Sequence, residues 1–117
     1  MAYARFLLSG STNGRQIPVA ATSTPGTTIH TAVTGTTSFD EIYLWVANVT
    51  STDRNLTIEW GGVLAPGDHL ISVVSIPANC PRFNICTGEV LNNGLIVRAF
   101  ASAANALNIG GYVNRIT

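Results

Sequence analysis

The stretch LIVRAFASAANALNIGGYVNRIT, residues 95–117, decides the fold class, because it can form either a C-terminal helix or two strands. Its middle is rich in alanine, which is the best helix former. A helix through Gly110 and Gly111 would nevertheless lose about 1 kcal/mol for each glycine relative to alanine. The apolar residues of the second half also form no clean stripe at the 3.6-residue spacing of a helix. The helix is therefore disfavoured.

Two strands fit the same stretch better. Residues 95–101 are rich in β-branched and aromatic side chains, which favour extended structure. Residues 102–105 can turn at Asn105, and residues 106–116 then alternate along an extended chain. We predict a C-terminal hairpin with the alanines at and beside its turn.

The preceding unit, FDEIYLWVANVTSTDRNLTIEWGG at residues 39–62, carries the clearest strand pattern. Its first half is apolar on both faces, which indicates a central or doubly covered strand. Residues 51–55 supply a turn, and residues 56–60 return with one apolar face. This pattern predicts a second hairpin with an aromatic-rich core, in which Trp45 and Trp60 are packed.

Further strand signals flank these two units. Pro18 cannot donate to a ladder, so its segment belongs at a sheet edge. His30 lies between two threonines on a strand that we expect to be exposed, and we expect its ring to be solvated. The remaining predicted strands lie within residues 2–9, 16–22, 23–38, 69–77 and 82–90.

About eight strands, separated by turn signals every eight to twelve residues, are typical of a sandwich or small barrel. We predict an all-β fold, a two-sheet antiparallel β-sandwich of Ig-like or jelly-roll type without a substantial helix. The 117 residues suffice for one core, so residues 1–117 are expected to form a single domain. Residues 1–10 are its first strand or a projecting N-terminal arm.

The charge content is low. Only 10% of the residues are charged, the net charge is zero, and all six basic residues are arginines. Such a surface suits coverage by other subunits, and it equally suits a small β-protein that uses Thr and Asn in place of charge. The scattered arginines argue against nucleic-acid binding, which needs a clustered basic face.

The chain offers no evident targeting, membrane or metal signal. No apolar stretch approaches the roughly 20 residues that span a bilayer, and no signal-peptide pattern is visible. We therefore expect synthesis in the cytosol and no membrane partner. Cys80 and Cys86 lack the further ligands of a structural zinc site. We expect free thiols, with a short-loop disulfide as the alternative, and neither metal nor cofactor.

Catalytic patterns are sparse. The carboxylates of Asp40, Asp53 and Asp68 fall at turns or strand starts, where aspartate caps the local backbone. A hydrolase hypothesis would join Asp68 and His69 to a nearby serine, but no nucleophile elbow surrounds them. We do not expect an enzyme.

The aromatic residues allow a third class of function. Tyr43, Trp45, Trp60 and Tyr112 could form a stacking platform for sugars or bases, although packing of both tryptophans in the core is favoured.

Residues 39–117 resemble small virion proteins of tailed bacteriophages. In these proteins a unit of the form E-[IV]-x-[LV]-x-[VA]-x-N…LTI-x-WGG is followed by a final [VI]-R-A-[FY]-A-S-A-x-N segment. The present chain carries both, as EIYLWVAN…LTIEWGG and as IVRAFASAAN. The first 38 residues do not contribute to the resemblance.

The resemblance implies a non-enzymatic virion component made in the host cytoplasm. The expected role is a capsid decoration (cement) protein, often trimeric, which binds the major capsid protein on the outer shell and reinforces it. A tail or head–tail connector component is the nearby alternative, and a carbohydrate-binding adhesin module is a further one. The candidate interface residues are Tyr3, Arg5 and Phe6, together with Arg98 and Arg115, which we expect to pair with acids across a subunit interface.

Overall fold

The computed structural model describes residues 3–117 and is all-β, as predicted. Over this range the chain forms nine strands and no helix. Their bounds are β1 Tyr3–Leu7, β2 Ile17–Pro18, β3 Thr27–Thr31, β4 Phe39–Asn48, β5 Arg54–Trp60, β6 His69–Ile76, β7 Phe83–Leu91, β8 Ile96–Ala101 and β9 Leu107–Ile116.

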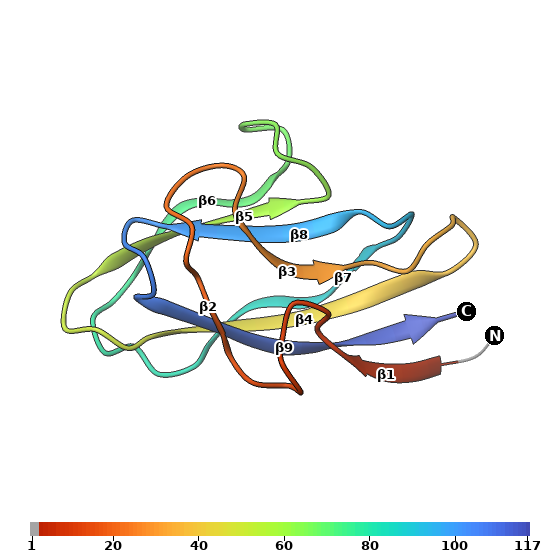
Figure 1. Ribbon diagram of the computed structural model, residues 1–117, viewed down its shortest axis with the longest axis horizontal. Coiled ribbons are helices and arrows are strands. Elements are labelled where there is room, and N and C mark those ends of the chain that lie inside the picture. Colours follow the sequence, from red (N-terminus) through yellow and green to blue (C-terminus); the bar gives the residue numbers. More distant parts are fainter. Residues whose placement is uncertain (1–2) are drawn as a thin grey trace.

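The strands form two antiparallel sheets that stack as two layers (Figure 1). Sheet A has the order β1-β9-β4-β7, and the short β2 pairs with the other end of β9. Sheet B has the order β3-β8-β5-β6. Strand β4 is central in sheet A, which confirms the prediction made from its two apolar faces.

The pairing pattern is that of a jelly roll. With β2 set aside, the first strand pairs with the last, β3 with β8, β4 with β7 and β5 with β6. This nested pairing is a long hairpin rolled into two sheets. The jelly-roll alternative of the predicted sandwich is therefore the observed one.

Both predicted hairpins are wrong, although their strands are right. Strand β4 lies in sheet A and β5 in sheet B, and β8 and β9 are likewise in opposite sheets. In each case the turn carries the chain across the core to the other layer. Of the described strands that follow one another directly, only β5 and β6 pair. Turn residues mark where a strand ends, and they do not say which sheet the next strand joins.

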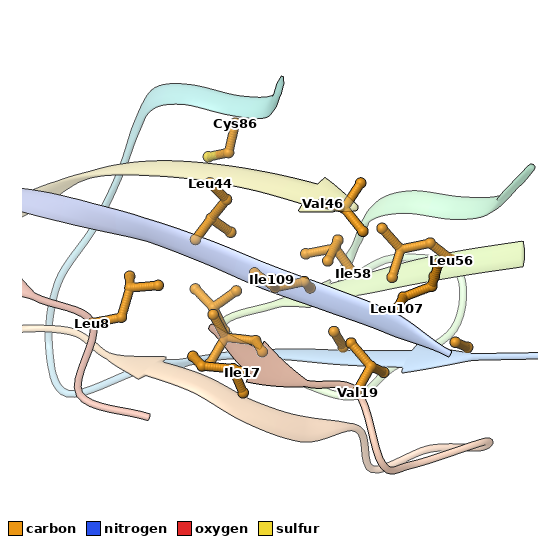
Figure 2. Close-up of a cluster of buried hydrophobic side chains, with 14 of the residues drawn as sticks. Leu8, Ile17, Val19, Leu44, Val46, Leu56, Ile58, Cys86, Leu107 and Ile109 are labelled. Atoms are coloured by element: carbon orange, nitrogen blue, oxygen red, sulfur yellow. The ribbon is translucent and has the colours of Figure 1, made fainter. Parts of the chain in front are cut away.

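The core is aliphatic rather than aromatic-rich. Every second residue of β4 is buried, and Figure 2 shows Leu44 of β4 and Ile109 of β9 reaching toward Ile58 of β5. Burying one such side chain contributes roughly 1.5–3 kcal/mol. The predicted packing of both tryptophans is half right, because Trp60 packs against the core whereas Trp45 lies on the other side of β4. The fully or nearly fully buried apolar side chains of the main cluster are Leu8, Ile17, Val19, Ile29, Ile42, Leu44, Val46, Leu56, Ile58, Ile76, Cys86, Val97, Ala99, Ala101, Leu107, Ile109 and Val113.

Gly111 explains why the alanine-rich tail ends in a strand against β4. A Cβ atom at this position would overlap the Tyr43 carbonyl oxygen of β4. Glycine thus permits the close approach of β9 to β4, which are paired in unbroken register along ten residues.

Strand β1 differs from the other outer strands. The pairings of β3, β6 and β7 are each interrupted by register shifts, which blunt a sheet edge. Strand β1 is regularly paired with β9, and all five of its residues are exposed. The N-terminal segment therefore forms a first strand at an open edge of sheet A.

Candidate binding face and the buried polar cluster

The outer face of sheet A is lined with aromatic side chains. Strand alternation turns Ile42, Leu44 and Val46 inward, so Tyr43 and Trp45 point outward. Tyr112 of β9 is directly opposite Tyr43 in the register, and their rings stack with centroids 4.9 Å apart and planes 14° apart. Because neither ring is in the core, this face offers a large apolar contact surface with polar edges.

Two guanidinium groups cover the ends of this aromatic row. Arg5 of β1 lies 4.6 Å from the centroid of the Tyr112 ring, and Arg82, just before β7, lies 3.8 Å from that of Trp45. Both arginines are exposed, and neither has a carboxylate at ion-pair distance within residues 3–117. Stacking holds each planar group in place while its N–H fork stays open. We call these two arginines and Tyr43, Trp45 and Tyr112 the aromatic face.

The aromatic face is shallow rather than enclosed. Its hollow has a volume of about 170 Å³, below the roughly 300–1,000 Å³ of ordinary small-molecule sites. Beside it, the Trp45 Nε1 atom and the Gln16 side-chain amide lie so close over Gly110 that a Cβ there would meet both at about 2.5 Å. Glycine therefore lets the indole lie flat on β9. The lining residues are Tyr43, Leu44, Trp45, Arg82, Asn84, Cys86, Thr87 and Tyr112.

A cluster of three polar side chains lies on the inner side of the same sheet. Asp40 of β4 is 0% exposed and accepts two hydrogen bonds from Arg115 of β9, from Nε at 2.7 Å and from Nη2 at 3.0 Å. It also contacts the His30 Nε2 atom of β3 at 2.7 Å and accepts from the Val33 backbone N–H at 3.1 Å. The Arg115 guanidinium in turn lies 4.4 Å from the centroid of the Phe6 ring. We call His30, Asp40 and Arg115 the buried triad, and it links both sheets.

The hydrogen bonds assign the state of His30. The Ser9 backbone N–H donates to Nδ1 at 3.0 Å, so Nδ1 carries no proton and Nε2 donates to Asp40. Burial lowers the pKa of His30 and outweighs the opposing effect of Asp40. Burial alone would raise the pKa of Asp40, but the hydrogen bonds from Arg115 and His30 hold it below its ordinary value. The triad is thus a neutral histidine beside an ion pair.

Three expectations about these residues are corrected. His30 is 1% exposed rather than solvated, because a bulge after Thr28 turns it inward next to Ile29. Asp40 does more than cap the local backbone, since it neutralises Arg115. The acid that pairs with Arg115 belongs to its own chain, so no subunit interface is needed to supply it.

The other interface candidates lie in different places. Tyr3 and Arg5 are exposed on β1, 64% in the case of Tyr3. Phe6 points to the other side of β1, toward Arg115. Arg98 is half-buried on β8 of sheet B, away from the aromatic face. The structure therefore places Tyr3 and Arg5, which share one side of β1, beside the aromatic row, and a role for each of the five at an interface stays a prediction.

The residues of the hydrolase hypothesis are not arranged as a catalytic triad. Asp68 accepts from the Leu64 backbone N–H at 3.0 Å, which is the turn role predicted for it. His69 Nδ1 lies 3.3 Å from the Ser72 hydroxyl, and no Asp68–His69 contact orients the ring. A buried acid that the sequence did not single out is Glu59, which accepts from the Gly26 backbone N–H at 2.7 Å and from the Thr24 hydroxyl.

Both cysteines are free thiols, as expected. Burial raises the pKa of Cys86 to about 12, so this thiol is inert at neutral pH. Within residues 3–117 there is no cluster of three or more metal-ligating side chains, and the same range contains no helix long and apolar enough to span a membrane. Comparisons with family models, with curated proteins and with solved structures found no match for this chain.

Proposed function

We propose that this chain is a virion structural protein of a tailed bacteriophage, of the capsid decoration (cement) type. In this role it binds the major capsid protein on the outer surface of the head and stabilises the shell. The observation that carries the proposal is the aromatic face: stacked rings, and two arginines that have no acid partner among residues 3–117, lie on one side of the sandwich. Tyrosine, tryptophan and arginine are the side chains enriched at protein interfaces.

The fold and composition support the same role. Jelly rolls recur in viral capsid domains, although a fold alone does not assign a function. An oligomer that binds the shell through several equal, weak contacts gains avidity. After its first subunit has bound, the contacts of the other subunits form within the same complex. A trimer, as the resemblance implies, would engage three equivalent capsid sites. Binding to the assembled shell but not to its free subunits stabilises the shell by mass action.

The test is co-sedimentation with purified heads of the phage that encodes the chain. We expect the protein to pellet with mature heads, not with free capsid subunits, and to raise the temperature at which the heads open. Heads that pellet without it, and open at an unchanged temperature, would remove the proposal.

A carbohydrate-binding module is the second candidate, and the position of Trp45 favours it. This indole lies on the outer face and not in the core, where a sugar ring could stack in place of Arg82. A glycan array separates the two candidates. Specific glycan binding that Trp45→Ala abolishes and Trp60→Phe leaves intact would support the carbohydrate-binding module. An array without any bound glycan would remove it and leave the decoration role as the single candidate.

A further inference from the structure

Three arginines lie over aromatic rings, and the one that has a hydrogen-bond partner shows which kind of group the other two can bind. Arg115 lies over Phe6, and its N–H fork is filled by both carboxylate oxygens of Asp40. Stacking covers one face of the guanidinium group, and the bidentate carboxylate fills the fork formed by Nε and Nη2. This is a completed site within the same chain.

Arg5 and Arg82 each have the aromatic ring but, within the described chain, no carboxylate in the N–H fork. Each lies over an aromatic ring, at 4.6 Å and 3.8 Å from the centroid, and each is exposed without an acid in the described chain. The ring restricts the guanidinium group before any partner arrives, so less conformational entropy is lost when its fork is filled. The missing component is a carboxylate.

The spacing of the two arginines limits the shape of the partner. Their backbones lie at opposite edges of sheet A, on β1 and next to β7, with β9 and β4 between them. Three strand spacings separate these backbones by about 14 Å across the sheet. Both guanidinium groups lean inward, over rings of the neighbouring strands β9 and β4. Glu41 alternates outward with Tyr43 on β4 and is level with Arg5, because both are opposite Asn114 of β9, so a continuous polyanion such as a nucleic acid would meet a negative charge near Arg5. Two separated carboxylates with apolar atoms between them fit this pattern.

We propose that the aromatic face docks an acidic polypeptide segment of a partner protein, whose two carboxylates fill the forks of Arg5 and Arg82 while its apolar atoms between them contact Tyr43 and the ring edges that the two arginines leave open. This inference rests on the proposed function, in which that segment belongs to the capsid protein. It adds the surface and the chemistry of the contact.

The test uses the full chain and short poly-L-glutamate as the probe, followed by the Trp45 indole N–H signal in NMR. We expect saturable shifts of that signal. The Arg5→Ala and Arg82→Ala changes should each weaken binding about tenfold, the size expected for one charge-assisted contact. The matched control is Arg15→Ala, another exposed arginine, which should leave the affinity within about twofold. Arg5→Lys with Arg82→Lys should lose most of the affinity, because an ammonium group cannot make the fork.

Three results would overturn the inference: no saturable binding, an equal loss in the Arg15→Ala control, or tighter binding to polygalacturonate than to poly-L-glutamate, which would point to an acidic sugar. A binding experiment with phage heads distinguishes failure of this inference from failure of the proposed function. If wild-type protein binds heads and the Arg5→Ala, Arg82→Ala double variant binds equally well, only the inference fails. If poly-L-glutamate binds as expected and heads are not bound, the proposed function fails, and with it the assignment of the segment to the capsid.

Discussion

The inner and outer sides of sheet A use the same chemistry to different ends. On the inner side, Arg115 has its ring and its carboxylate within the chain, together with a buried histidine that joins the second sheet. On the outer side, Arg5 and Arg82 each lie over a ring, and neither pairs with a carboxylate in the part of the chain that the structure describes. An arginine paired within the chain contributes to the contact between the two sheets, whereas an exposed one without an internal acid among the described residues is available to a partner. Changes on the two sides should therefore separate stability from binding.

The largest expected effect follows from removing the carboxylate of the buried triad. Asp40→Ala leaves the partly exposed Arg115 without its counter-charge and the buried His30 without its acceptor. Loss of hydrogen bonds to a charged group costs about 1.5–3 kcal/mol. Urea unfolding should show this loss as a lower midpoint with an unchanged slope. A midpoint that hardly moves would mean that the triad does not hold the two sheets together.

A smaller effect concerns pH. Because the pKa of His30 is lowered in the folded state, the unfolded chain binds more protons as the pH falls below about 6.5. The free energy of unfolding should therefore be constant near neutrality, and the raised pKa of Cys86 should lower it again above the ordinary pKa of 9.0. It should fall below pH 6.5 by up to about 1.4 kcal/mol per pH unit for this one group. The lowered pKa of Asp40 adds a loss of the same sign near and below its ordinary pKa of 3.8.

The control for the pH prediction is the second histidine. His69, at the start of β6, contacts the Ser72 hydroxyl and the edge of the Phe100 ring and takes no part in the buried triad, so His69→Ala should keep the pH dependence that the triad supplies. His30→Gln, which can both donate and accept, should flatten the curve between pH 6.5 and 5. Equal curves for wild type and His30→Gln would contradict the assignment of the buried neutral ring.

The smallest expected effect on stability is on the outer side. Arg5→Ala and Arg82→Ala remove exposed side chains whose stacking contacts are not part of the core, and each should change the free energy of unfolding by less than about 0.5 kcal/mol. Urea midpoints of the two variants should coincide with wild type. A large loss in either variant would erase the distinction between the two sides.

The strands were predictable from the sequence, and their partners were not. Period-two patterns located β4, β5 and β9, and the two glycines excluded a helix in the tail. The turn at residues 51–55 has the same composition whether it closes a hairpin or crosses to the other sheet. The jelly-roll strand order depends on pairs of strands that are far apart in the sequence, and the local residue pattern does not identify these pairs.

The functional side chains show the same limit. Alternation separates the Tyr43 side of β4 from the Leu44 side, but both are apolar, so the sequence could not say which one meets the core. The inward turn of His30 depends on a bulge between threonines, which carry no special signal for it. Arg5 was singled out from its aromatic neighbours in sequence, although the ring that it covers is Tyr112 at the far end of the chain.

The most direct test of the account is acrylamide quenching of Trp45 fluorescence in a Trp60→Phe variant, in which Trp45 is the only tryptophan left. The measurement is made with and without saturating heads. If the outer face of sheet A is the docking surface, bound heads should shield Trp45 and lower its quenching constant severalfold. Unchanged quenching of protein that demonstrably pellets with the heads would show that binding uses another surface.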